Sequence, residues 1–264
     1  MGEGRIMQEQ LSRATQDAKA ERAPTLSNSL LRFRCICSIQ QYSHYLLFIG
    51  TKIKMLQYDV VVVTPLQENC SLIWCDATNK AALIDPGGDT DKILAFLEGK
   101  DVELERILIT HTHFDHVGAA ADLAEKFNIP IEGSHADDEF LVEALPHQGA
   151  MFGYPAVRPY TPDRYFQQGD KIQIGETELN VHHCPGHTPG HIAFSNQEAK
   201  IAFVGDVIFQ GSVGRTDFER GDPHALIRSI KQQLLPLGDD FSFVPGHGPN
   251  STFGQERLTN PFIR

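Results

Sequence analysis

The chain has 264 residues, of which 41% are hydrophobic and 22% are charged, and its formal net charge is -11. This length allows one large domain with a sizeable core, and the composition is that of an ordinary soluble globular protein. The acidic balance argues against a nucleic-acid partner, which would require a basic face.

Residues 1–54 differ from the rest of the chain. They hold eight basic and four acidic residues, whereas residues 55–264 hold 15 and 30. They also lack sustained periodicity, so we expect a disordered extension at 1–54 and one folded domain at 55–264. The apolar run at 45–49 is too short to span a bilayer, and the acids near the N-terminus argue against a mitochondrial transit peptide. We therefore expect a cytoplasmic protein that does not associate with membranes.

From residue 58 onward the sequence alternates between strand and helix patterns. Apolar and β-branched runs predict strands at 59–63, 71–75, 81–84, 106–109, 171–174, 178–182, 192–194, 201–204 and 241–244. Helical spacing predicts helices at 90–98, 117–127 and 223–235, and Gly175-Glu176 predicts a hairpin. Many short strands in two groups, each followed by helices, predict an α/β fold in which helices cover two packed sheets.

The segment Thr110-His-Thr-His-Phe-Asp-His116 is dense in metal-binding side chains. His111 and His113 are two residues apart on extended backbone, so both imidazoles can point the same way. Asp115 and His116 lie at the turn into the next helix, whose N-terminus favours an acid. Zinc takes about four ligands. These four residues together with more distant candidates exceed that number, which predicts two metal ions.

Three more candidates each lie just past a predicted strand, in a turn that contains glycine. They are His187 in Cys184-Pro-Gly-His-Thr-Pro-Gly-His191, Asp206 in Gly205-Asp206, and His247 in Pro245-Gly-His-Gly248. Loops at one edge of a sheet are where catalytic residues gather. The sequence therefore predicts a metal site built from His111, His113, Asp115, His116, His187, Asp206 and His247.

This set resembles the metallo-β-lactamase superfamily, in the His-Xaa-His-Xaa-Asp-His element followed by His, Asp and His in that order. The sequences 185–191 and 214–218 are similar to those of the glyoxalase II group, the hydroxyacylglutathione hydrolases. The resemblance implies a four-layer αβ/βα sandwich. It also implies that His111, His113 and His187 hold one ion, that Asp115, His116 and His247 hold the other, and that Asp206 bridges both.

The expected reaction is hydrolysis of a small thioester derived from glutathione, S-lactoylglutathione, to lactate and glutathione. Two cations would bind and activate a shared hydroxide, and Asp115 and Asp206 are the expected catalytic residues. Zinc is the expected metal, although histidine and carboxylate ligands suit iron and manganese as well. A thiolate can leave without a dedicated acid because thiols have a pKa of about 8.5.

The likeness stops short of the longer glyoxalase II enzymes, which continue into a C-terminal helical region that grips the glutathione carboxylates. Only 17 residues follow His247 here. The chain is therefore expected to resemble the short bacterial type, which lacks that region.

Three polar residues near the ligands have an expected supporting role. Asp85 closes an apolar strand and is expected to support a ligand or cap a turn. His191 is expected to support a ligand rather than bind metal. Arg215 either binds a substrate anion or forms a structural ion pair with Asp217 or Glu219.

Two other functions remain open at the level of sequence. The first is an iron-dependent persulfide dioxygenase of the same superfamily, which would use one iron and oxygen in place of water. The second is a non-catalytic module, which is disfavoured because ionisable groups packed together without a metal are costly.

Overall fold

In the computed structural model of this chain, residues 55–151 and 153–264 are described, and the predicted disordered extension at 1–54 lies outside them. The strands are β1 (Leu56–Val63), β2 (Glu68–Cys75), β3 (Lys80–Ile84), β4 (Glu103–Ile109), β5 (Ile131–Gly133), β6 (Lys171–Ile174), β7 (Thr177–His183), β8 (Ile192–Asn196), β9 (Ile201–Gly205), β10 (Ile208–Phe209), β11 (Ser212–Val213), β12 (Ser242–Pro245) and β13 (Ser251–Thr252). The helices are α1 (Thr90–Leu97), α2 (Phe114–Val117), α3 (Ala120–Phe127), η1 (Ala136–Asp138), α4 (Glu139–Met151), α5 (Pro223–Ser229), η2 (Ile230–Leu234), η3 (Leu235–Leu237) and α6 (Phe253–Thr259).

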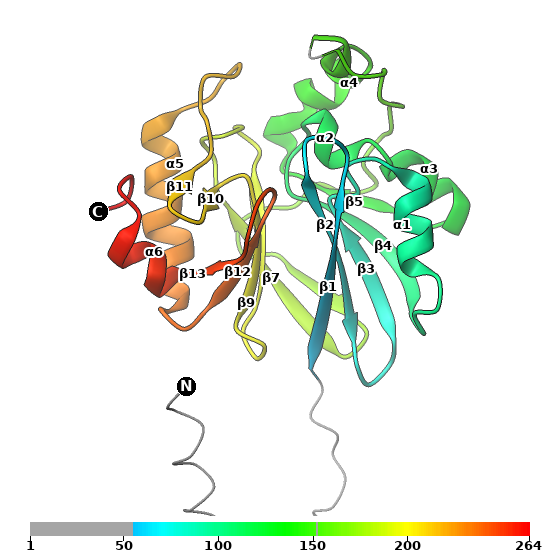
Figure 1. Cartoon of the computed structure of the whole chain (residues 1–264), viewed down its shortest axis with the longest axis horizontal. Helices are drawn as coiled ribbons and strands as arrows, with labels where there is room; N and C mark the ends of the chain where they lie inside the picture. The colour runs from blue at the N-terminus through cyan, green and yellow to red at the C-terminus, as the bar shows by residue number, and fades with distance from the viewer. Residues whose placement is uncertain (1–54, 152) are drawn as a thin grey trace, which may run out of the picture. The chain divides into compact units, whose positions relative to one another are not determined.

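Two sheets form the centre of the described domain. One has the strand order β1-β2-β3-β4-β5 and the other the order β13-β12-β9-β8-β7-β6. Figure 1 shows α1 and α3 on the outer side of the first sheet, and α5 and α6 on the outer side of the second. The arrangement is helix, sheet, sheet, helix, so the expected four-layer αβ/βα sandwich is confirmed.

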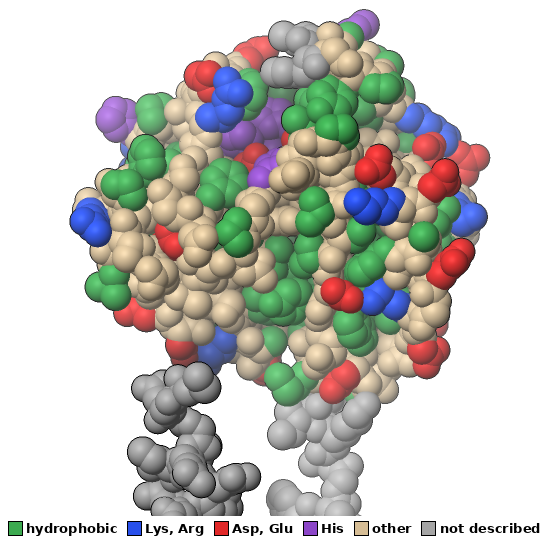
Figure 2. Space-filling model, in the orientation of Figure 1, with side chains coloured by type: hydrophobic (Ala, Val, Ile, Leu, Met, Phe, Trp, Pro, Cys, Tyr) green, Lys and Arg blue, Asp and Glu red, His purple; other side chains and the backbone are tan. Residues whose placement is uncertain are grey.

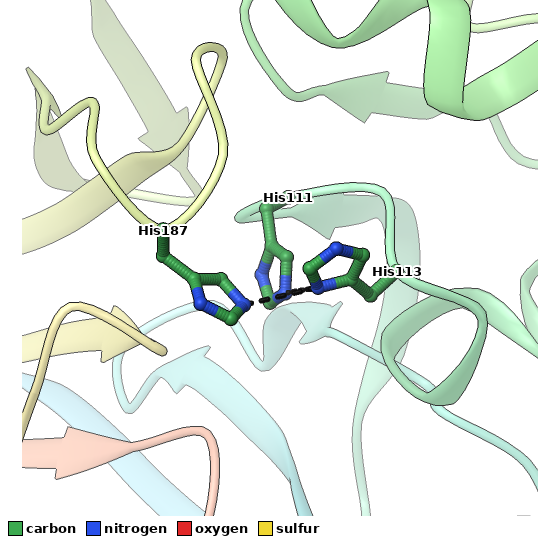
Figure 3. Close-up of side chains that lie close together, drawn as sticks. All are labelled: His111, His113 and His187. Atoms are coloured by element: carbon green, nitrogen blue, oxygen red, sulfur yellow. Dashed lines mark hydrogen bonds between the residues drawn. The ribbon is translucent and has the colours of Figure 1, made fainter. Parts of the chain in front are cut away.

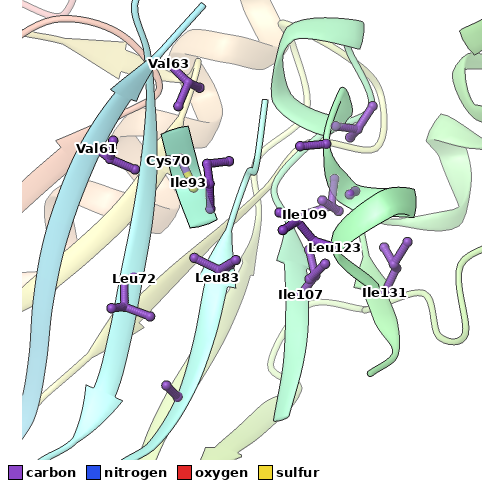
Figure 4. Packing of buried hydrophobic residues seen from close by; sticks show 14 of the residues in the cluster. Val61, Val63, Cys70, Leu72, Leu83, Ile93, Ile107, Ile109, Leu123 and Ile131 are labelled. Carbon is purple, nitrogen blue, oxygen red and sulfur yellow. The ribbon is translucent and has the colours of Figure 1, made fainter. Parts of the chain in front are cut away.

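Alternation along the strands produces these layers, since successive side chains of a strand point to opposite faces. In β4, Ile107 and Ile109 pack towards α1 and α3, while Leu108 packs between the sheets. In β9, Ala202 and Val204 pack towards α5, while Ile201 and Phe203 pack between the sheets. Figure 4 shows the first of these cores, with Ile93 of α1 and Leu123 of α3 against the strand residues. Apolar residues on both faces explain why the central strands read as continuous apolar runs.

The helix predicted at 117–127 is wrong at its start, because the structure has two short helices, α2 and α3, there. The backbone between them passes against the loop after β3, and the Ala119 N–H donates to Pro86 O at 2.9 Å instead of to a helical carbonyl. The helix predicted at 223–235 begins at Pro223, with Asp222 as its N-cap, but α-helical geometry ends at Ser229.

Several elements had no sequence prediction. They are β5, η1 and α4 between residues 128 and 151, β10 and β11 after Asp206, and β13 and α6 near the C-terminus. No helix among residues 55–151 and 153–264 is long and apolar enough to cross a bilayer.

Candidate metal centre

The seven predicted ligands come together at one edge of the two sheets. His111, His113, Asp115 and His116 follow β4, His187 lies between β7 and β8, Asp206 follows β9, and His247 follows β12. Figure 2 shows a hollow at this edge with histidine side chains inside it and hydrophobic side chains beside it. Because both sheets direct strand ends to the same edge, Asp115 and His247 become neighbours although they are 132 positions apart in the sequence.

Three imidazoles form the first ligand group. His113 Nδ1 lies 3.1 Å from His111 Nε2 and 3.0 Å from His187 Nε2. Figure 3 shows the three rings pointing at a common centre, His187 from one loop and the other two from the segment after β4. Three nitrogens this close around one point form a group that can hold a metal ion.

The second group consists of Asp115, His116 and His247, and Asp206 lies beside both groups. His247 Nε2 is 3.4 Å from Asp115 Oδ2. Asp206 Oδ1 is 3.5 Å from His116 Nε2, while Asp206 Oδ2 is 3.6 Å from His187 Nε2 and 3.8 Å from His247 Nε2. The Asp206 carboxylate therefore contacts one histidine of the first group and two of the second.

The outer nitrogen of each of four imidazoles faces a hydrogen-bond acceptor. His187 Nδ1 donates to Arg215 O at 2.7 Å, and His247 Nδ1 donates to Leu66 O at 3.0 Å. His116 Nδ1 lies 3.0 Å from Asp85 Oδ2. His111 Nδ1 lies 3.1 Å from the Thr110 hydroxyl, which itself donates to Asp85. These partners place the proton on Nδ1 and leave each Nε2 lone pair directed into the cluster, as metal-binding histidines require.

A second observation indicates that these side chains bind a divalent metal ion. His116 Nε2 and Asp206 Oδ1 are buried and have no hydrogen-bond partner among the described residues. Buried polar atoms without partners are costly, so a native structure normally supplies one. A cation between these two atoms would satisfy both.

The protonation states of the first group also suit a metal. Burial lowers the pKa of His113 to about 3 and also lowers the pKa of His111 and of His187, so these rings are neutral at pH 7. In the second group, by contrast, Asp206 beside His116 and Asp115 beside His247 outweigh burial and raise the pKa of both rings. Burial acts to raise the pKa of Asp206, but the neighbouring histidines, His116 first among them, outweigh burial and the net pKa is lowered. Neutral imidazoles and ionised carboxylates are the forms that bind cations.

Asp85 and His191 lie against the ligands and outside both groups. Asp85 Oδ1 accepts the Thr110 N–H at 2.7 Å, while Asp85 Oδ2 contacts His116. His191 stacks on His111 with ring centroids 4.6 Å apart, and its Nε2 accepts the Asp206 N–H at 3.0 Å. Both side chains therefore contact proposed ligands, and the role in orienting them stays a prediction.

The loop of His247 is held by a residue that the sequence did not single out. Asn69 Nδ2 donates to Pro245 O and to Gly248 O, each at 2.9 Å, and the Asn69 N–H donates to Gly246 O at 2.8 Å. A side chain at Gly246 would overlap Asp206 Oδ1, so glycine is required for this loop to approach the cluster.

Two buried acids near the cluster also escaped the sequence. Glu68 is fully buried, with Oε1 3.9 Å from His116 Nδ1, and burial raises the pKa of its carboxyl well above the ordinary value. Asp138 accepts the Gly190 N–H at 2.6 Å and the Thr188 hydroxyl at 2.9 Å. Neither lies in a ligand-like motif, so no local pattern pointed to them.

A pocket of about 600 Å³ opens above the two groups. Arg215 is part of its lining. Its guanidinium donates from Nε and Nη2 to the two oxygens of Asp217, each at 2.6 Å, and this pairing lowers the pKa of Asp217 to about 2. The structure therefore has the ion pair that the sequence analysis gave as the alternative to anion binding.

Comparisons with known proteins agree with this geometry. The family model described as metallo-beta-lactamase superfamily matches residues 63–247. Hydroxyacylglutathione hydrolase GloC from Haemophilus influenzae is 48% identical over 209 residues, which cover 79% of this chain and 98% of that protein. A crystal structure of TTHA1623 in a di-iron-bound form is 40% identical, with a TM-score of 0.71, covering 77% of this chain and 99% of that one. The structure of the BLEG-1 B3 metallo-beta-lactamase is 33% identical, with a TM-score of 0.73, covering 78% and 99%.

Proposed function

Since this chain belongs to the metallo-beta-lactamase superfamily, we propose that it is a metal-dependent thioester hydrolase of the hydroxyacylglutathione type, with S-lactoylglutathione as a substrate. The observation that carries the proposal is the pair of adjacent ligand groups with Asp206 beside both. The relative from Haemophilus influenzae, named a hydroxyacylglutathione hydrolase, supports the choice of substrate.

The proposed ligand sets follow the two groups. His111, His113 and His187 would hold one ion, and Asp115, His116 and His247 the other. Asp206 would bridge them, because its two oxygens face histidines of different groups. Zinc is the proposed metal, and iron is its competitor because TTHA1623 has a di-iron-bound form.

Two divalent ions held here would lower the pKa of a water molecule and polarise the substrate carbonyl. Asp115 would accept a hydrogen bond from the attacking water and orient it, since its Oδ2 lies at the pocket floor beside His247. After this water has lost a proton to solvent, its oxygen would bond to the carbonyl carbon while the carbon–sulfur bond breaks. The products would be the acid, which ionises, and the thiolate. Because thiols have a pKa of about 8.5, the thiolate leaves without a dedicated acid.

A persulfide dioxygenase is the second candidate function. A dioxygenase that uses one iron does not need a complete second ligand group, yet Asp115, His116 and His247 form one here. This observation favours hydrolysis.

Metal analysis combined with two assays tests the proposal. We expect two equivalents of zinc and turnover of S-lactoylglutathione, with no oxygen consumption in the presence of glutathione persulfide. His247→Ala should reduce hydrolysis by about 100-fold or more, because it removes one ligand of the second ion. One equivalent of iron, with oxygen consumption that survives His247→Ala, would instead establish the dioxygenase.

A further inference from the structure

The pocket above the ligand groups has an apolar wall. It is formed by Leu66, Phe114, Leu141, Phe209, Val213 and Phe218, and its floor includes His113, His187, Asp206 and His247. A volume of about 600 Å³ is in the range of small-molecule sites. Because wall and floor belong to one pocket, a substrate whose carbonyl reaches the floor also lies against the wall.

Few charged side chains line this pocket apart from the proposed metal ligands. Among the described lining residues, the charged side chains other than the proposed ligands are Arg215 and Glu219. The Arg215 guanidinium is paired through two hydrogen bonds with Asp217 and lies 4.3 Å from the centre of the Phe218 ring. Among the described residues that line the pocket, no Lys or Arg side chain without an acidic partner is therefore available to bind a substrate carboxylate.

Resting on the proposed thioester hydrolase function, we infer that the pocket selects thioesters with an apolar acyl group and does not recognise the carboxylates of glutathione. Burial of an apolar acyl group against this wall is favourable. A carboxylate moved from water to the same wall without a free cation loses its hydration and gains no partner. The substrate class is therefore thioesters of apolar acids, with little dependence on the charge of the thiol.

Four thioesters test the preference for an apolar acyl group and the indifference to the charge of the thiol independently of each other. The acyl group is either lactoyl or phenylacetyl, and the thiol is either glutathione or the uncharged N-acetylcysteamine. We expect kcat/KM of the metal-loaded enzyme to be about tenfold or more higher for phenylacetyl than for lactoyl with either thiol. For a given acyl group, the two thiols should differ by less than about threefold, at low and at high salt.

A variant that adds a cation to the wall extends the test. The Leu66 side chain is 38% exposed, so the charged end of an arginine at this position can reach water at the edge of the pocket, and the Leu66 carbonyl that holds His247 is kept. We expect Leu66→Arg to raise the preference for glutathione over N-acetylcysteamine by about fivefold or more. Leu258→Arg is the matched control, because Leu258 is 72% exposed on α6 and is not part of the pocket lining.

Three results would overturn the inference. One is a wild-type preference for glutathione of more than about tenfold that weakens with salt, since it would reveal a charge clamp. Another is a lactoyl preference with both thiols. The last is an unchanged thiol preference in Leu66→Arg, which would mean that charge on this wall does not reach the substrate. If none of the four thioesters is hydrolysed, the proposed function itself fails, whereas hydrolysis that favours lactoylglutathione refutes the apolar selection alone.

Discussion

The carboxylate of Asp138 accepts the backbone N–H of Gly190 at 2.6 Å, across 52 residues of sequence. It also accepts the Thr188 hydroxyl at 2.9 Å and a hydrogen bond from the Thr112 backbone N–H. Thr112 lies between His111 and His113, and Thr188 follows His187. One buried acid thus ties together the two loops that supply the first ligand group.

Replacing Asp138 by alanine should weaken metal binding at the first group by about 10- to 100-fold, the usual effect of losing a group that positions metal ligands. Competition with a chromogenic chelator measures this affinity without relying on activity. Asp137→Ala is the matched control, because Asp137 is the exposed neighbouring acid. Equal affinities for the two variants would show that Asp138 does not hold these loops.

Asp138 also gives a pH-dependent prediction for stability. Burial raises the pKa of its carboxyl to about 6 from an ordinary value of 3.8. A raised folded-state pKa means that this group's contribution to stability is fully present below about pH 4 and is lost as the pH rises through about 6. The free energy of unfolding falls by about 3 kcal/mol over this range because of Asp138. Asp138→Asn removes this pH dependence, because an amide does not titrate.

The difference in unfolding free energy between Asp138→Asn and wild type should therefore shift in favour of the variant, by up to about 3 kcal/mol, between pH 4 and pH 7. Urea unfolding of both proteins with chelator present gives this quantity at each pH. The remaining titrating groups occur in both proteins and largely cancel. A difference that stays constant with pH would contradict the raised pKa.

Asp206→Asn should reduce binding of both ions, because this residue is the proposed bridge and contacts histidines of both groups. Elemental analysis after dialysis is expected to give well under two equivalents of metal, with hydrolysis reduced by about 100-fold or more. Two retained equivalents and a wild-type rate would refute the bridging assignment.

Asn69→Ala should affect mainly the second ion. It removes two hydrogen bonds to the loop of His247, which costs about 1 to 3 kcal/mol. We expect metal content to fall from two equivalents towards one, since His111, His113 and His187 do not depend on that loop. Asn250→Ala is the control, because Asn250 is exposed in the same loop region. Loss of metal in both variants alike would argue against a specific role of Asn69.

A chain without residues 1–54 should keep its metal content and its kcat/KM within about twofold. Both sheets, all seven proposed ligands and the pocket lining belong to residues 55–264. Circular dichroism and metal analysis of the shortened chain check this expectation. Loss of folding would disprove the prediction that the domain is contained in residues 55–264.

The sequence by itself determined the layers and the proposed ligands, for local reasons. An apolar run such as 106–109 predicts a buried strand, and the structure has β4 there with Ile107, Leu108 and Ile109 all buried. The seven candidate ligands lie within a few residues of predicted strand ends, so a local pattern was enough to find them. Their metal-binding roles remain predictions, although the structure brings all seven side chains together.

Only the tertiary structure decided which residues support the site and what the pocket selects. The bonds of Asn69 to the loop of His247 span 176 and 179 residues, and that of Asp138 to Gly190 spans 52, so no local pattern could reveal them. The pairing of Arg215 with Asp217 and the apolar wall also depend on side-chain packing. Ligands concentrate in short motifs because a metal requires several donors at one point, whereas the groups that position them are chosen by three-dimensional proximity alone.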